Sequence, residues 1–288
     1  MTMKKNSQRL MLLSAGVAAV FAASTAQASL VALYNYNLPG DLGRDASANS
    51  NHLIGSGAPV SVAGKYGGGL DLNGTNATLV SANGGLTNLP TGNSSYTIAT
   101  WMNADTAGNN GAGGLIGWGN YGTVNEVTAF RMNGNSSLHN YWWGNDLTGF
   151  PGIDLTTGSG SAGWHHAAVT YDAISTLNAM YLDGNLIRSR YATGHNAGGA
   201  NFAVGKTVGS EYFDGQLDDT AIFNQALTRS QITAIMAGNF SAFGVNNVPE
   251  PSSLLLTAAA LSLLAWVKLP RRGRRNMSGN MSGNMTGN

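Results

Sequence analysis

Short β-propensive segments separated by glycine and asparagine are the feature that most constrains how this chain folds. The 288 residues include 40 glycines. Residues 96–102, Tyr-Thr-Ile-Ala-Thr-Trp-Met, alternate with the two-residue period of a strand. Residues 168–171 and 179–182 follow the same pattern. Many brief strands joined by turns are typical of an all-β domain.

Two short polar segments predict hairpin turns between such strands. Residues 183–185, Asp-Gly-Asn, separate one apolar run from the next, and residues 73–76, Asn-Gly-Thr-Asn, stand between 70–72 and 78–80. Glycine, asparagine and aspartate tolerate the positive φ angles that tight hairpin turns require. We therefore expect a hairpin at each of these two places.

One short helix is predicted late in the chain. Thr228 and Gln231 have the spacing of a capping box, and Gly238 is placed to end the helix. The expected apolar face consists of Ile232, Ile235 and Met236. A single late helix among many strands favours a two-sheet sandwich over an alternating α/β fold.

The N-terminus has the pattern of a secretory signal peptide. An apolar run at 10–23 follows a positively charged segment that contains Lys4, Lys5 and Arg9. The predicted cleavage site has small residues before the scissile bond and consists of Ala26, Ala28 and Ser29. Because the apolar run is short for a membrane span of about 20 residues, we expect cleavage by signal peptidase.

The C-terminus carries a second specialised segment. Pro249, Glu250 and Pro251 precede an apolar run at 252–267. A basic cluster follows, with Arg271, Arg272, Arg274 and Arg275. The apolar run lies at the lower edge of the 17–25 residues that a membrane-spanning helix needs, and the arginines would keep their end in the cytoplasm.

These three ordered parts resemble the PEP-CTERM sorting signal of exopolysaccharide-producing Gram-negative bacteria. The resemblance covers 248–275 and implies recognition by an exosortase in the membrane. The chain departs from that pattern beyond the arginines, because 276–288 form a four-residue repeat based on Met-Ser-Gly-Asn. Such a composition forms no packed core, and we expect this tail to be disordered.

The segment between the two ends is acidic, although the whole chain has a formal charge of +1. Residues 29–247 contain seven basic and thirteen acidic side chains, a net charge of −6. This charge gives no electrostatic reason to expect nucleic-acid binding. The chain contains no cysteine, so disulfides do not stabilise it.

Several stretches of this segment resemble laminin G-like, concanavalin A-like jelly-roll domains. The central signature lies at 163–172 and 181–184, and a second stretch lies at 212–228. The strand at 95–101 and the glycine-rich segment at 67–74 match the parts that precede them. The resemblance runs from Val31 to Ala237. It implies an all-β, two-sheet antiparallel jelly-roll sandwich.

The expected organisation is therefore a signal peptide at 1–28, a jelly-roll domain at 29–247, a sorting signal with a transmembrane helix at 248–275, and a tail at 276–288. This architecture implies an exported protein of the cell surface or extracellular matrix. At least transiently, the C-terminal helix would anchor it in the inner membrane.

Catalysis is not expected, although the family that the chain resembles includes glycoside hydrolases and lyases. Most glycosidases need two carboxyl groups across the scissile bond, and related laminarinase-like enzymes carry a Glu-x-Asp-x-x-Glu run. No such run occurs here, and the domain holds only two glutamates, Glu126 and Glu211. His165 and His166 are neighbours on a predicted strand and face opposite ways, so they are not placed to share a metal.

A structural calcium ion is the metal that the resemblance implies. Asp45 and Asn51 lie in an early loop rich in oxygen ligands, the type that Ca²⁺ prefers. Carried over from related jelly rolls, they would face Asp218, with Asp219 as the less favoured candidate. The alternative is that these side chains only form turns and accept backbone hydrogen bonds.

Aromatic residues indicate a ligand site. Trp142 and Trp143 precede Asn145 and Asp146, so an exposed indole would stack on a sugar ring beside side chains that bind its hydroxyls. Core packing is the alternative for each tryptophan. We expect a non-catalytic protein whose domain binds an extracellular polysaccharide or a surface protein. A polysaccharide-degrading enzyme and a purely structural matrix component are the alternatives.

Overall fold

The computed structural model describes residues 28–105, 111–156 and 163–245. The predicted sorting motif, basic cluster and tail lie outside the described residues, as does the signal peptide apart from Ala28 at the cleavage site. Within the described ranges, no helix has both the length and the apolar character needed to cross a membrane.

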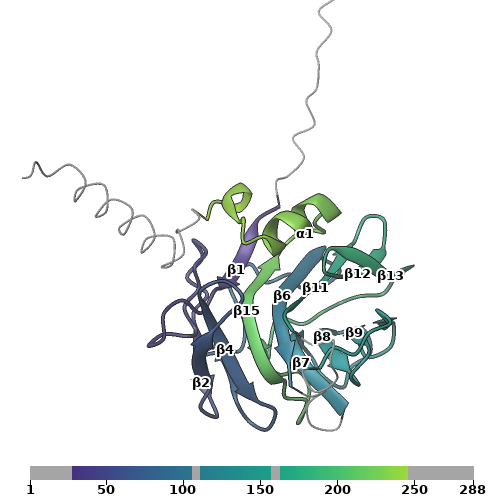
Figure 1. The fold of residues 1–288 in the computed structure, drawn as a ribbon. Coiled ribbons are helices and arrows are strands. Elements are labelled where there is room, and N and C mark those ends of the chain that lie inside the picture. The colour runs from purple at the N-terminus through teal and green to yellow at the C-terminus, as the bar shows by residue number, and fades with distance from the viewer. Residues whose placement is uncertain (1–27, 106–110, 157–162, 246–288) are drawn as a thin grey trace, which may run out of the picture.

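Two antiparallel sheets form the domain (Figure 1). The larger sheet has the order β13-β12-β11-β6-β15-β4-β3, with β1 paired to β15. Its strands are β1 (Leu30–Tyr34), β3 (Val60–Ala63), β4 (Gly68–Asn73), β6 (Tyr96–Ala104), β11 (His165–Asp172), β12 (Leu177–Leu182), β13 (Asn185–Tyr191) and β15 (Asp214–Phe223).

The smaller sheet has the order β10-β9-β8-β7-β14-β5-β2. Its strands are β2 (Leu53–Ser56), β5 (Thr78–Ser81), β7 (Ala112–Gly119), β8 (Val127–Asn133), β9 (Leu138–Tyr141), β10 (Leu147–Gly149) and β14 (Ala203–Val204). The expected all-β, two-sheet antiparallel sandwich is therefore confirmed.

The main core lies between the two sheets. Ile98 and Val169 face each other in register on β6 and β11, and they pack in one buried cluster with Phe130 and Met132 of the smaller sheet. Every second residue of these strands points into this cluster, because successive side chains of a strand point to opposite faces. Burial of this apolar surface is the main stabilising contribution to the sandwich.

The two predicted hairpins have different outcomes. Asp183 (φ 50°) and Gly184 (φ 73°) form a two-residue turn between the paired strands β12 and β13, as expected. The prediction at 73–76 is wrong, because β4 belongs to the larger sheet and β5 to the smaller one. The Asn73 side-chain oxygen accepts hydrogen bonds from three successive amides, those of residues 75–77, and this turn carries the chain between the sheets.

A second apolar cluster covers the outer face of the larger sheet. Helix α1 (Arg229–Met236) begins at the predicted capping box of Thr228 and Gln231, and Figure 1 shows it lying over the ends of β15 and β6. Ile232 and Ile235 are buried in this cluster. The outer face of the larger sheet is thus partly covered by the chain itself.

The outer face of the smaller sheet carries a loop at 205–213 that begins directly after β14. Its backbone lies against Gly114 of β7, whose amide donates to the Glu211 carbonyl at 3.1 Å. A Cβ atom at Gly114 would come within 2.2 Å of the Thr207 nitrogen, so any other residue would force the loop outward. This close approach brings the side chains of the loop over β8 and β9.

Candidate functional site

A small apolar patch on the outer face of the smaller sheet is the base of the candidate site. Val127 and Ala129 of β8 pack with Tyr141 of β9, and Tyr121 and Val208 cover them. Val127, Ala129 and Tyr141 point away from the main core because they alternate along their strands with residues that enter it. The patch therefore holds aromatic surface on the outside of the sandwich.

A charged cluster lies beside this patch. Arg131 of β8 forms an ion pair with Glu211 of the 205–213 loop, and its guanidinium carbon lies 4.3 Å from the centre of the Tyr141 ring. The Thr207 hydroxyl donates to the second oxygen of Glu211 at 2.5 Å. His139 accepts from the guanidinium Nε at 3.3 Å and stacks on Tyr141 with ring centres 5.6 Å apart. These contacts hold Arg131 and Tyr141 in one geometry.

Trp143 has an unusual backbone conformation. Its φ angle is +70°, a left-handed value that costs energy in a residue with a side chain and that often occurs at functional sites. The side chain is 38% exposed, and its ring centre lies 5.9 Å from that of Tyr141. The structure thus presents a large aromatic ring to solvent.

Asp146 supports the turn that carries Trp143. Its Oδ1 accepts hydrogen bonds from the amides of Trp142 at 2.9 Å and Gly144 at 3.3 Å, and Oδ2 lies 3.5 Å from His139 Nε2. Burial by itself would raise the pKa of Asp146, but the contact with His139 and the amide of Trp142 outweigh it and lower the pKa. Asp146 is therefore ionised at neutral pH.

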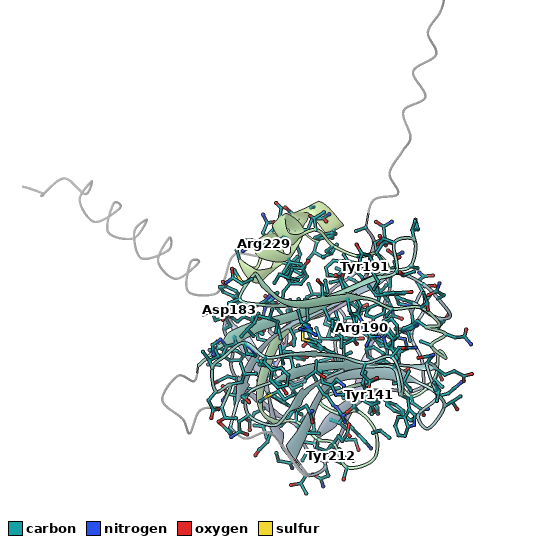
Figure 2. The ribbon with its side chains drawn as sticks, turned by 90° about the vertical axis from the view of Figure 1, so that its right-hand side faces the viewer. Tyr141, Asp183, Arg190, Tyr191, Tyr212 and Arg229 are labelled. Atoms are coloured by element: carbon teal, nitrogen blue, oxygen red, sulfur yellow. The ribbon has the colours of Figure 1, made fainter. Side chains whose placement is uncertain are left out.

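These side chains surround a cavity of about 400 Å³, lined by Arg131, Tyr141, Trp143, Gly144, Asp146, Val208 and Glu211. In the view of Figure 2, Tyr141 lies between Arg190 above and Tyr212 below. The cavity combines two aromatic rings with one guanidinium and two carboxylates. Such a set stacks on an apolar ring face and exchanges hydrogen bonds with hydroxyl groups.

Only some of the ligand-binding residues predicted from the sequence line the cavity. Trp143 and Asp146 line the cavity. Trp142 has 0% exposure and lies between the sheets, so it does not belong to the candidate site. Tyr141 lines the cavity instead. Asn145 lies beside the cavity, where its amide group donates to Asn125 Oδ1 and the Thr193 carbonyl.

Three residues of the candidate site, Tyr141, Arg131 and Glu211, are not among those predicted from the sequence. Tyr141 ends β9 directly before Trp142 and Trp143, so this aromatic run was a usable signal for it. Arg131 lies on β8, where no motif marked it, and Glu211 reaches the site from a loop 80 residues further along the chain. Sequence spacing alone carries no information about such a contact.

Asp45 and Asn51 of the predicted calcium site do lie together. Asp45 Oδ2 accepts from the Asn51 amide at 2.8 Å and Oδ1 from the Leu33 amide at 3.0 Å. Ser47 donates to Asp45 through both its amide and its hydroxyl. Asn51 in turn binds the backbone of Thr87 through its oxygen and its nitrogen. Both side chains act as hydrogen-bonded supports for the early loop.

Asp218 and Asp219 face different surroundings. Asp218 Oδ2 accepts from the Tyr66 amide at 2.7 Å, and burial together with the neighbouring charge of Asp219 raises its pKa to about 8. Asp219 instead lines a pocket of about 400 Å³ near Ser47 and Asn35. Oxygens of Asp45, Asn51 and Asp218 thus accept N–H hydrogen bonds, which is the alternative role that the sequence left open for them.

No three acidic or histidine side chains in the described ranges lie close enough to hold one metal ion together. Calcium binding thus stays a prediction made from sequence. Thermal unfolding with and without a chelator checks it, because bound calcium raises the midpoint and an unchanged midpoint would count against the site.

Substituting Asp45→Ala is expected to lower the free energy of unfolding by about 3 kcal/mol, to the same extent in calcium and in chelator. The reason is that buried N–H groups lose a charged acceptor. Urea unfolding measures the loss. The exposed Asp41→Ala serves as control and should change stability by less than about 0.5 kcal/mol. A loss seen only when calcium is present would contradict the hydrogen-bonding role.

Comparison with known protein families gives the relationship of this chain. Residues 73–233 match the Laminin_G_3 family, the concanavalin A-like lectin/glucanases superfamily. The match spans more than half of the chain. This protein belongs to the concanavalin A-like lectin/glucanases superfamily. The resemblance to a concanavalin A-like jelly-roll domain is therefore confirmed.

Solved structures share the same fold. Domain 4 of AbnA, an extracellular arabinanase of Geobacillus stearothermophilus in complex with arabinotriose, has 22% identity and a TM-score of 0.55 over 73% of this chain and 98% of that domain. The binding domain of Paraclostridial mosquitocidal protein 1 has 16% identity and a TM-score of 0.57, over 73% of this chain and 52% of that one.

The binding domain of botulinum neurotoxin serotype G has 13% identity and a TM-score of 0.57, over 72% of this chain and 50% of that one. This concanavalin A-like chain thus spans about half the length of the two toxin binding domains. A search of curated proteins found no match. At these identities the similarity shows a shared fold, which hosts both enzymes and binding domains.

Proposed function

We propose that this concanavalin A-like domain binds a saccharide chain in the cavity at Trp143 and Tyr141. The observation that carries the proposal is the exposed indole of Trp143, which is held at positive φ beside charged groups that are themselves fixed by hydrogen bonds. Preorganised aromatic and polar groups lose little entropy on binding. The solved structure of AbnA domain 4 with arabinotriose supports the proposal through its shared fold.

Binding without turnover is the form of the activity that we propose. Two carboxylates, Asp146 and Glu211, line the cavity, which is the observation that favours a polysaccharide-degrading enzyme as the second candidate. Glycoside hydrolysis requires one of the two to be a protonated acid. Asp146 has a lowered pKa, and Glu211 is paired with Arg131 and hydrogen-bonded to Thr207. Neither is arranged to donate a proton.

Replacing Trp143 by glycine is expected to abolish saccharide binding by the purified protein on a glycan array. Glycine adopts positive φ without strain, so the fold is kept while the stacking surface is lost. The matched control is Val60→Ala, which removes an exposed apolar side chain from the edge of the larger sheet and should leave binding unchanged.

The array also separates the candidate functions. Release of reducing ends from any bound polysaccharide would overturn the non-catalytic proposal in favour of the enzyme. Silence on the array together with no turnover would support a structural matrix component instead.

Export is the setting that we propose for this domain. The signal peptide pattern at 1–28 and the resemblance of 248–275 to a PEP-CTERM signal support it. The partners would be signal peptidase and an exosortase during sorting, and an extracellular polysaccharide or surface protein afterwards. Mass spectrometry of the surface-exposed protein tests sorting, since a new C-terminus near residues 249–251 is the expected product and an intact 288-residue C-terminus would contradict it.

A further inference from the structure

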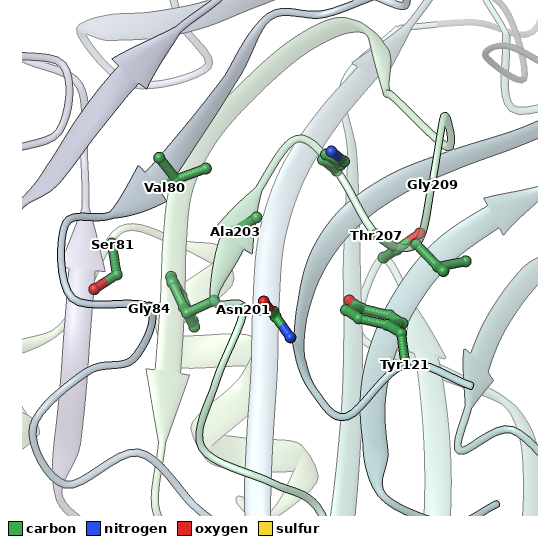
Figure 3. Close-up of a pocket in the computed structure, with 11 residues that line it drawn as sticks. Val80, Ser81, Gly84, Tyr121, Asn201, Ala203, Thr207 and Gly209 are labelled. Atoms are coloured by element: carbon green, nitrogen blue, oxygen red, sulfur yellow. The ribbon is translucent and has the colours of Figure 1, made fainter. Parts of the chain in front are cut away.

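A second pocket lies on the same outer face of the smaller sheet (Figure 3). It encloses about 410 Å³, and its walls include Val80, Ser81, Tyr121, Asn201, Lys206 and Thr207. The pocket lies where β5, β14 and the 205–213 loop meet. Its size is similar to that of the cavity at Trp143.

The two cavities are neighbours across the 205–213 loop. Val208 lines both of them. Tyr121, in the wall of the second pocket, packs in one apolar patch with Tyr141, in the wall of the first. Thr207 in the second pocket donates to Glu211 in the first. A chain that crosses the loop at Val208 would therefore contact both cavities.

One wall of the second pocket is formed by Tyr121, whose hydroxyl is buried. Among the described residues, the buried hydroxyl of Tyr121 has no hydrogen-bond partner, and a buried polar group of this kind is costly unless something pairs with it. Figure 3 shows the hydroxyl of Tyr121 directed toward Asn201. Burial raises the pKa of Tyr121, so the hydroxyl keeps its proton and can donate.

Lys206 sets the charge of this pocket, since no acidic or other basic side chain among the described residues lines it. Its ammonium lies 4.8 Å from the centre of the Tyr212 ring, and it forms no ion pair within the described ranges. Arg131 in the neighbouring cavity is instead neutralised by Glu211. The second pocket therefore attracts an anion through the uncompensated charge of Lys206, whereas the positive charge in the first cavity is already paired.

We propose that the pocket at Lys206 binds an acidic sugar unit of the same saccharide chain whose neighbouring units occupy the cavity at Trp143. This inference rests on the proposed saccharide binding and names its substrate class, an acidic polysaccharide. The ammonium of Lys206 would pair with a carboxylate or sulfate substituent, while Tyr121 donates to an oxygen of the same unit. The net charge of −6 on residues 29–247 opposes this contact only weakly, because distant charges are screened beyond about 8 Å at physiological ionic strength.

Paired polysaccharides test the proposal with the purified protein. The probes are alginate, polygalacturonate and hyaluronan, each beside its carboxyl-reduced form, and a sulfated galactan beside its desulfated form. Affinity electrophoresis or calorimetry should show about tenfold tighter binding of at least one acidic form than of its neutral counterpart, which is the effect expected of one charge-assisted contact. The pair that shows the preference identifies the substituent.

Lys206→Gln should abolish this preference, so that the acidic form binds no more tightly than its neutral counterpart. Tyr121→Phe should weaken binding of the acidic form several-fold. Lys65→Gln is the matched control, because it removes the same charge from a lysine that lies over Trp101 of the larger sheet, and it should keep the preference.

Other outcomes would contradict either the acidic subsite or the proposed saccharide binding. Equal binding of acidic and neutral forms, or a preference that survives Lys206→Gln, would overturn the acidic subsite while leaving saccharide binding intact. A preference lost equally in Lys65→Gln would assign it to overall charge and also overturn the subsite. Absence of binding to every probe and to the glycan array would overturn the proposed function itself.

Discussion

Replacing Trp142 by alanine should lower the free energy of unfolding by about 3–5 kcal/mol, the range measured for large aromatic residues removed from cores. Trp142 has no exposed surface. Its indole N–H donates to the Tyr96 hydroxyl at 3.0 Å, and its ring meets Tyr171 edge-on with centres 4.9 Å apart. Alanine would leave a cavity between the sheets and remove a donor from Tyr96.

Urea unfolding measures this loss, and the neighbouring residue provides the control. Trp143→Gly removes a ring of the same size from the next position, but it also removes the strain of a positive φ, which costs on the order of 1 kcal/mol. We expect the stability of Trp143→Gly to equal or slightly exceed that of the unmodified protein. If both substitutions destabilise to the same extent, the assignment of the two rings to opposite faces is wrong.

Acidification from pH 7 to pH 4 should destabilise the domain by several kcal/mol through two buried histidines. Burial lowers the pKa of His166 to about 4, although Asp183 opposes this effect. Burial likewise lowers the pKa of His195 to about 4, although the Gly92 carbonyl opposes it. Both values lie below 6.5, the ordinary pKa of histidine, so the unfolded chain takes up protons first.

The stability that these histidines contribute is fully present above about pH 6.5 and is lost as the pH falls toward 4. Each contributes about 3 kcal/mol over that interval, since one pKa unit corresponds to about 1.4 kcal/mol. Urea unfolding at a series of pH values measures the slope of the unfolding free energy against pH.

Burial in the core disfavours the charged form of His195, although polar groups contact both of its ring nitrogens. Its Nε2 lies 2.9 Å from the Thr128 hydroxyl and its Nδ1 lies 3.0 Å from the Gly92 carbonyl. The imidazole ring stacks on the Tyr171 ring with centres 5.4 Å apart, and its centre lies 4.2 Å from the centre of the Trp142 ring.

His195→Gln should therefore reduce the loss of unfolding free energy between pH 6.5 and 4, whatever the stability of this variant at pH 7. His166→Gln should remove a further part of the same loss. The exposed His52→Gln is the control and should keep the slope. An unchanged slope in the double variant of His166 and His195 would contradict the assignment.

Local signals in the sequence determined many features of the fold. Asp183 and Gly184 predicted their hairpin because only a few residue types tolerate two successive positive φ angles. Thr228 and Gln231 predicted the start of α1 because the capping box joins residues three apart. Each of these signals depends on neighbours in the chain, so sequence alone carries it.

Only the tertiary structure decided which sheet each strand joins and which face of a strand is covered. The turn at 73–76 has the composition of a hairpin, yet β5 pairs with β14 and β2 because distant strands provide its hydrogen-bond partners. The sequence also does not reveal that Trp142, not Trp143, enters the core, because both residues follow the end of β9. The pairing of Arg131 with Glu211 and the pocket at Lys206 exist because the 205–213 loop folds against Gly114. Contacts between residues tens of positions apart are set by the packing of the whole sandwich, which no local pattern encodes.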